Sequence, residues 1–120
     1  MDCIFCAIVA GELPAHVVAE TETALAFMDI NPATRGHCLV IPKRHAADLM
    51  EIPEDDLAEC MLLARDLARR AKDALGADGV NLLNSCGVAA WQTVFHFHIH
   101  VVPRPLGRDG LERRWILTPG

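Results

Sequence analysis

The sequence lacks any long apolar run. No stretch approaches the ~20 consecutive apolar residues that a membrane-spanning helix needs, and the first residues lack the basic segment that opens a secretory signal. The apolar stretch near the start is short and is interrupted by Gly11 and Glu12. These absences exclude a spanning helix, argue against a membrane partner and predict a cytoplasmic protein.

The sequence also has no excess of basic residues, and its number of cysteines is odd. Lys and Arg number 11 against 16 Asp and Glu, which gives a net charge of −5 and argues against nucleic acid as a partner. Any bound phosphate must therefore be met locally. Five cysteines, an odd number without a secretory signal, argue against a disulfide framework and favour reduced thiols or metal ligands.

Repeats, low-complexity tracts and linkers are absent as well. A chain of 120 residues with 52% hydrophobic and 22% charged residues has the composition of a folded protein rather than a disordered one. We therefore predict a single domain over residues 1–120.

Short segments of alternating character predict an α+β fold with a mainly antiparallel sheet. The predicted strands are residues 17–20, 24–29, 37–41, 80–84 and 93–102, the last two being joined by a loop over 85–92. The first two strands form a hairpin, and prolines at 42 and 103 are expected to end the third and the fifth strand.

One long helix is predicted over residues 53–75. Apolar residues recur there at three- and four-residue steps, Pro53 suits the first helical position and Gly76 can end the helix. The charged residues are expected to form a solvated face. The predicted apolar stripe consists of Leu57, Met61, Ala64, Ala68, Ala71 and Leu75.

Three histidines alternate with apolar residues inside the predicted last strand. Successive side chains of a strand point to opposite faces, so His96, His98 and His100 share one face. The other face carries the apolar side chains Phe95, Phe97, Ile99 and Val101. Three imidazoles that titrate near neutral pH indicate a chemical site, and the alternative is an accidental cluster on a solvated face.

A second chemical signal is the pair Cys3 and Cys6. Two thiolates at this spacing can bind one tetrahedral Zn²⁺, which needs two further nitrogen or sulfur ligands. We expect His45 and His96 to supply them and to tie the amino terminus to two strands. Four protein ligands make a structural zinc site, and the alternative for the cysteine pair is a thioredoxin-like redox role.

Two blocks of sequence carry a family resemblance. Residues 92–104 match the signature of the histidine triad (HIT) proteins, and residues 27–32 followed by 36–45 also look like that family. The resemblance runs from Cys3 to about Arg104, and the cysteine pair resembles the bacterial Hint-like branch with its zinc site. It implies a five-stranded antiparallel sheet with one long and one short helix, a homodimer, and a core at about 3–104 followed by a tail at 105–120.

The same resemblance implies a role for each matching residue. His98 matches the nucleophile that forms a covalent nucleotidyl-histidine, and His100 matches the partner that contacts the phosphate. Asn84, Gln92 and Thr93 match polar groups around the phosphate, although turn formation is an alternative for them. Asp29 matches the carboxylate that binds the ribose hydroxyls. The residues that look like the pocket for the base, with core packing as the alternative, are Phe5, Ile8, Phe27, Ile30 and Leu39.

The expected activity is that of a hydrolase or transferase that cleaves a nucleoside monophosphate, with a purine base, from an amine or other leaving group. The alternatives are a dinucleoside polyphosphate hydrolase and a non-catalytic module that binds nucleotide or metal. The sequence departs from the family at Trp91, where many relatives have a glycine-containing segment. The indole could cap the site, narrow the range of leaving groups or pack against another subunit. In relatives the C-terminal tail, here with Trp115, lies near the active site of the dimer mate.

Overall fold

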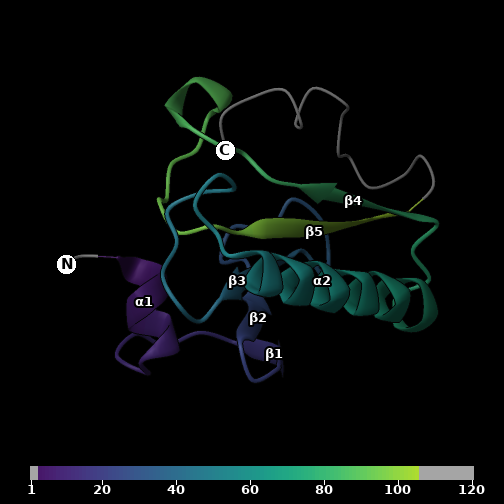
Figure 1. The fold of residues 1–120 in the computed structure, drawn as a ribbon. Helices are drawn as coiled ribbons and strands as arrows, with labels where there is room; N and C mark the ends of the chain where they lie inside the picture. The colour runs from purple at the N-terminus through teal and green to yellow at the C-terminus, as the bar shows by residue number, and fades with distance from the viewer. Residues whose placement is uncertain (1–2, 106–120) are drawn as a thin grey trace.

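The structure, a computed structural model, describes residues 3–105. Its five strands are β1 (Val17–Glu20), β2 (Ala24–Met28), β3 (Cys38–Pro42), β4 (Gly79–Leu83) and β5 (Ile99–Arg104). All neighbouring strands run antiparallel, in the order β1-β2-β3-β5-β4 (Figure 1). The predicted α+β fold with a five-stranded antiparallel sheet is confirmed. The tail from residue 106 lies outside the described residues, and the extent of the domain and the dimer stay predictions.

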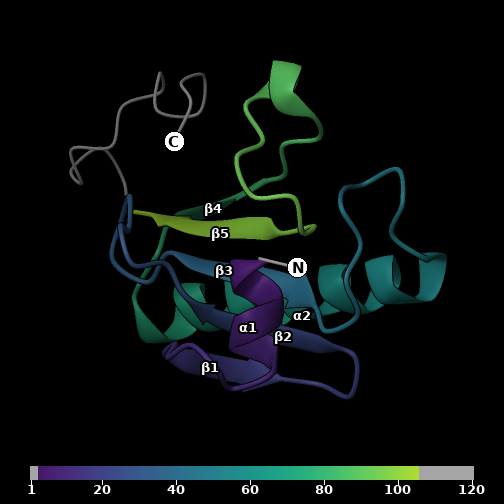
Figure 2. The same ribbon diagram turned by 90° about the vertical axis from the view of Figure 1, so that its left-hand side faces the viewer.

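The two α-helices cover opposite faces of this sheet. They are α1 (Ile4–Val9) and α2 (Glu54–Ala74), and a short 3₁₀ helix, η1 (Val88–Ala90), lies in the loop between β4 and β5. Figure 2 shows α1 in front of the sheet and α2 behind it. No helix of the described residues is long and apolar enough to cross a membrane.

Alternation along β3 divides the core into two clusters. Cys38 and Val40 pack with α2, whereas Leu39 and Ile41 pack with Phe5 of α1. Every residue of β3 is buried because both faces of the central sheet are covered. The α1 side of the sheet is the side on which the candidate site lies.

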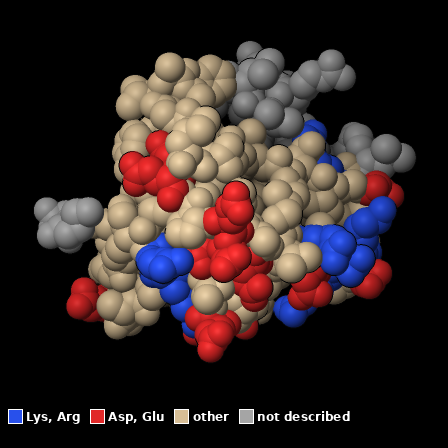
Figure 3. Space-filling view, viewed as in Figure 1, with Lys and Arg blue, Asp and Glu red and all other residues tan. Residues whose placement is uncertain are grey.

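The limits of α2 agree closely with the predicted helix, but the buried stripe differs. Met61 and Leu75 are exposed, and the buried residues outside the predicted stripe are Asp56, Cys60, Leu63 and Leu67. Asp56 is accommodated because its carboxylate accepts hydrogen bonds from Nε and Nη2 of Arg44, at 3.2 and 3.0 Å. Acidic side chains gather near the start of α2 and basic ones toward its end (Figure 3), as the helix dipole favours.

The last strand begins later than predicted, at Ile99 rather than residue 93, and it continues through Pro103 to Arg104. The late start follows from Pro42 at the end of β3. Continued pairing would place Phe97 opposite Pro42, which has no N–H to donate. The N–H of Phe97 instead donates to the Ala46 carbonyl at 2.7 Å. His96 and His98 therefore precede β5, and only His100 lies within it.

The division of side chains around this segment is nevertheless close to the prediction. Phe97, Ile99 and Val101 pack in the cluster that contacts α2, away from the imidazoles. Phe95 is the exception, because 44% of its surface is exposed and it belongs to neither core cluster. The apolar face thus begins at Phe97.

Candidate active site and metal site

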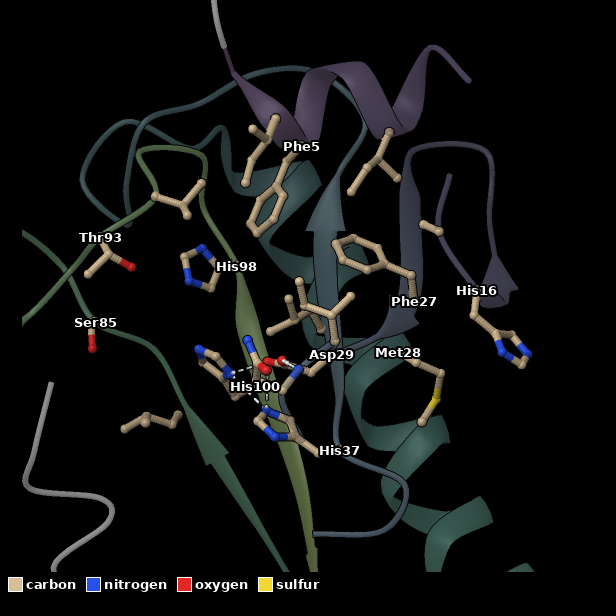
Figure 4. Close-up of a pocket in the computed structure, with 18 of the residues that line it drawn as sticks. Phe5, His16, Phe27, Met28, Asp29, His37, Ser85, Thr93, His98 and His100 are labelled. Atoms are coloured by element: carbon tan, nitrogen blue, oxygen red, sulfur yellow. Dashed lines mark hydrogen bonds and ion pairs between the residues drawn. The ribbon is translucent and has the colours of Figure 1, made fainter. Parts of the chain in front are cut away.

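A pocket of about 610 Å³ opens on the α1 side of the sheet. Figure 4 shows Phe5 and Phe27 on one side and Thr93 and Ser85 on the other, with His98 between them. The residues predicted to contact the base all line it, namely Phe5, Ile8, Phe27, Ile30 and Leu39. Three of these (Phe5, Phe27 and Leu39) also belong to the buried cluster beneath α1. The same side chains therefore pack in the core and line the pocket.

His98 is held as a neutral ring with a defined tautomer. Its Nδ1 lies 2.7 Å from the His96 carbonyl oxygen, which can only accept, so we assign the proton to Nδ1. Burial lowers the pKa of His98, opposed by that backbone hydrogen bond. The ring packs edge-on against Phe5 at a centroid distance of 5.3 Å. Nε2 of His98 therefore carries a lone pair at neutral pH.

His100 is held in a different way, through His37. The N–H of Ala33 donates to His37 Nδ1 at 3.0 Å, so the ring proton of neutral His37 is on Nε2. That Nε2 lies 2.9 Å from Nδ1 of His100 and donates to it. The proton of neutral His100 is consequently on its own Nε2. Burial lowers the pKa of His100 to about 4, with smaller contributions from His98 and His37.

His37 is the functional residue that the sequence analysis missed. It is 2% exposed, it lies just before β3, and Asp29 Oδ2 is 3.5 Å from its Nε2 and 4.0 Å from Nδ1 of His100. Its signal was a lone histidine before an apolar strand, which is weaker than the alternating trio. The three side chains resemble a metal-binding set. The Ala33 N–H argues against metal there, because it fixes the His37 proton on the nitrogen that would have to bind the ion.

The polar residues predicted around the phosphate divide into two groups. Gln92 and Thr93 line the pocket, whereas Asn84 is not among its lining residues. The Asn84 amide donates to the His98 carbonyl at 2.9 Å. Both ends of the Gln92 amide bond the backbone: Nε2 donates to the carbonyls of Ala47 and Val94 at 2.8 and 3.0 Å, and Oε1 accepts from the Gly87 N–H at 2.7 Å.

The four predicted zinc ligands converge at the start of α1. Cys3 caps this helix by accepting from the Cys6 N–H, which places both thiols at the same end. His96 Nδ1 lies 3.3 Å from Cys3 Sγ and 3.5 Å from Cys6 Sγ, and His45 Nδ1 lies 3.3 Å from Cys6 Sγ. The four donor atoms lie within 4.8 Å of one another.

These distances fit a tetrahedral zinc ion. Bond lengths of about 2.3 Å to sulfur and about 2.0–2.1 Å to nitrogen separate adjacent sulfur and nitrogen ligands by about 3.6 Å. His96 is also in the required tautomer, because its Nε2 donates to the Pro42 carbonyl at 2.8 Å and leaves Nδ1 unprotonated toward the thiols. The chemistry of the donor set thus suits Zn²⁺ at a closed four-ligand site.

Comparison with known proteins shows the family of this chain. The sequence profile of the HIT domain matches residues 10–106. The chain belongs to the histidine triad (HIT) family. An uncharacterised HIT-like protein of Mycobacterium tuberculosis is 48% identical over 103 residues, which cover 86% of this chain and 72% of that protein. The adenosine 5′-monophosphoramidase of Schizosaccharomyces pombe is 41% identical over 119 residues, covering 99% and 86% of the two chains.

Solved structures of HIT proteins have the same fold. A zinc-bound histidine triad family protein from Mycobacterium smegmatis superposes with a TM-score of 0.89 at 48% identity, covering 94% of this chain and 81% of that one. A HIT family member from Bacillus subtilis gives a TM-score of 0.86 at 40% identity, covering 93% and 79%. The fold of this HIT protein is therefore that of its family.

Proposed function

We propose that this HIT protein cleaves a nucleoside monophosphate from an amine or other leaving group through a covalent nucleotidyl intermediate on His98. The observation that carries the proposal is the hydrogen bonding of two neighbouring imidazole rings, which fixes the tautomer of each. His98 donates a hydrogen bond from its Nδ1–H to the His96 carbonyl, which leaves Nε2 unprotonated and nucleophilic. His100 accepts from His37 and keeps a donor at Nε2. The His98 ring can thus attack phosphorus, and the His100 ring can donate a hydrogen bond to the phosphate.

In the proposed reaction, Nε2 of His98 attacks phosphorus in line. The new N–P bond forms as the bond from phosphorus to the leaving group breaks. The leaving group departs with the electron pair and takes up a proton from the solvent. Positive charge on the His98 ring is stabilised by the hydrogen bond from Nδ1 to the His96 carbonyl. Water then attacks phosphorus and loses a proton to the solvent as the N–P bond breaks. The electron pair of that bond returns to Nε2, which restores neutral His98 and releases the nucleoside monophosphate. Another acceptor in place of water gives transfer.

The remaining residues bind and orient the nucleotide. Asp29 accepts hydrogen bonds from the ribose, and its Oδ1 is already held by the Asn31 N–H at 2.8 Å. Thr93 lies at the phosphate end of the pocket, and Gln92 keeps the loop in place beside it. Asn84 acts from outside the pocket by fixing the His98 backbone. The apolar end takes a purine, a choice supported by the two yeast relatives named adenosine 5′-monophosphoramidase.

The pocket favours an amine over a polyphosphate as the leaving group. None of the described residues that line it is Lys or Arg, and Asp29 adds a negative charge. A dinucleoside polyphosphate would bring several negative charges without a fixed cation to meet them. The non-catalytic alternative, in which all three histidines bind one metal ion, is also disfavoured. Both ring nitrogens of His96 are engaged, Nδ1 with the thiols and Nε2 with the Pro42 carbonyl.

Zinc, held by Cys3, Cys6, His45 and His96, is proposed to be structural. It would fix α1 to the sheet, and α1 carries Phe5 of the pocket wall. Four protein ligands leave no position for substrate. On the basis of the sequence, we also propose that the protein is a cytoplasmic homodimer without nucleic acid or membrane partners.

Steady-state turnover tests this function. The wild-type protein should hydrolyse an adenosine 5′-phosphoramidate with a kcat/KM well above that for a diadenosine polyphosphate. His98→Ala should remove activity on both while the far-UV circular dichroism and nucleotide affinity are retained. A reversed substrate order would support the polyphosphate alternative, and normal turnover by His98→Ala would remove His98 from the mechanism.

A further inference from the structure

Trp91 adopts a backbone conformation that suits glycine. Its φ is 73° and its ψ is 25°, and among the described residues it is the only non-glycine with positive φ. A bulky side chain in this left-handed region is strained, and such strain persists only where the surroundings enforce it. The indole lines the pocket and is 40% exposed.

The turn that presents Trp91 is held by several hydrogen bonds. The Trp91 N–H donates to the Val88 carbonyl at 2.9 Å, and the Gln92 N–H donates to the Gly87 carbonyl at 3.1 Å. The buried side chain of Gln92 ties the same turn to Ala47. The backbone at Trp91 is therefore fixed by its neighbours, and the indole is displayed from a fixed turn rather than from a free loop.

Trp91 belongs to the end of the pocket opposite the base. Thr93 and Ser85 mark this end in Figure 4, with His98 between them and Phe27. Two residues of chain span at most about 7 Å, so Trp91 lies near Thr93. Apolar Leu83 and Val94 also line the pocket, and no described Lys or Arg does. A group bound here meets an aromatic face and hydroxyls.

We propose that Trp91 is a specificity-determining residue whose indole receives a flat aromatic ring on the leaving group. The inference rests on the proposed function, since it names the leaving group of that reaction. An aromatic ring stacked in an offset or edge-on arrangement gains stabilisation beyond the area it buries. A small aliphatic amine cannot make this contact. The strained tryptophan is thus explained as a platform kept for binding.

Two phosphoramidates test the proposal, one with an arylethyl amine and one with a propyl amine on the same adenosine 5′-phosphate. Trp91→Ala should lower the ratio of their kcat/KM values about tenfold, and Trp91→Phe should lower it by less than about threefold. Trp91→Gly, which also relieves the strain, should match Trp91→Ala. The control is Phe95→Ala, because Phe95 is an exposed aromatic of the same segment that does not line the pocket. That variant should keep the wild-type ratio.

The outcomes separate this inference from the proposed function. If Trp91→Ala leaves the ratio of the two kcat/KM values unchanged, the proposed role of the indole is wrong, while the proposed hydrolase activity stands. A wild-type protein that cleaves neither phosphoramidate would overturn the proposed function. Binding then tests Trp91 alone: in a His98→Ala, Trp115→Phe variant it is the sole tryptophan. The arylethyl compound should quench its emission more strongly than the propyl compound, and equal quenching would contradict the inference.

Discussion

Replacing Gln92 with alanine should destabilise the protein, because this side chain joins three parts of the backbone. Its amide makes three hydrogen bonds, to Gly87, Ala47 and Val94, and the residue is 5% exposed. At about 1 kcal/mol for each net hydrogen bond, the free energy of unfolding should fall by about 3 kcal/mol. Turnover should fall as well, because the loop that carries Thr93 loses its anchor.

Urea denaturation monitored by circular dichroism measures the loss directly. The midpoint should move to lower urea with little change in slope, since the surface exposed on unfolding stays the same. Val88→Ala is the matched control in the same loop, because Val88 is 74% exposed and its truncation should change stability by less than about 0.5 kcal/mol. A loss below about 1 kcal/mol in Gln92→Ala would show that these hydrogen bonds do not hold the loop, and full turnover in it would remove Gln92 from the site.

Three further variants or conditions test other parts of the structure. Chelation, or Cys3→Ser, should lower the melting temperature more than the turnover per folded molecule, because metal bound to the native state adds to folding free energy; activity that tracks metal content at constant fold would make the metal catalytic. As pH falls from 6.5 to 4, burial of neutral His100, whose pKa is lowered to about 4, should reduce the free energy of unfolding by about 3 kcal/mol, since the unfolded chain takes up a proton first. Urea titrations at several pH values in that range should show that the free energy of unfolding of His100→Asn changes less with pH than that of the wild type. An equal dependence on pH would contradict the effect of His100 burial. Gly36→Ala should destabilise by about 1–3 kcal/mol, because φ there is +88° and a Cβ would lie 2.4 Å from Leu75 Cδ1; a wild-type melting temperature would refute this.

The sequence predicted the positions of most helices and strands along the chain well, because these elements have clear local signals. Pro53 and Gly76 bracket the long helix, and its observed limits differ from the predicted ones by one residue at each end. The buried stripe was partly wrong, and the burial of Asp56 in it depends on Arg44, which lies on another segment. Periodicity describes a helix alone and contains no information about such a partner.

The last strand shows a similar limit. Its alternation of histidine and apolar residues correctly separated the imidazoles from Phe97 and the core, although Phe95 was placed wrongly. The start of the strand was predicted too early, because it depends on Pro42 in the facing strand. Pairing between distant segments decides that boundary, and no pattern within residues 93–102 reports it.

The site residues were predicted to come together, and all except Asn84 line the pocket or form the Cys3–Cys6–His45–His96 cluster, but their hydrogen bonds were not predicted. The relay from Ala33 through His37 to His100 joins a turn, a loop residue and a strand. Its chemistry depends on which ring nitrogen faces which neighbour, and the sequence does not encode that in any local motif. The candidate zinc ligands were easier to predict, because Cys3 and Cys6 have a spacing that itself fits a metal ion.

Mass spectrometry of the protein during turnover tests directly whether a covalent nucleotidyl intermediate forms on His98. The wild type should be mixed with an adenosine 5′-phosphoramidate, quenched rapidly without acid, digested and compared with His98→Ala treated in the same way. The wild-type peptide should carry a nucleotidyl group, located at His98 by fragmentation, and the variant should carry no adduct. An adduct on His100, or rapid turnover by wild type through a step that leaves His98 unmodified at every quench time, would contradict it.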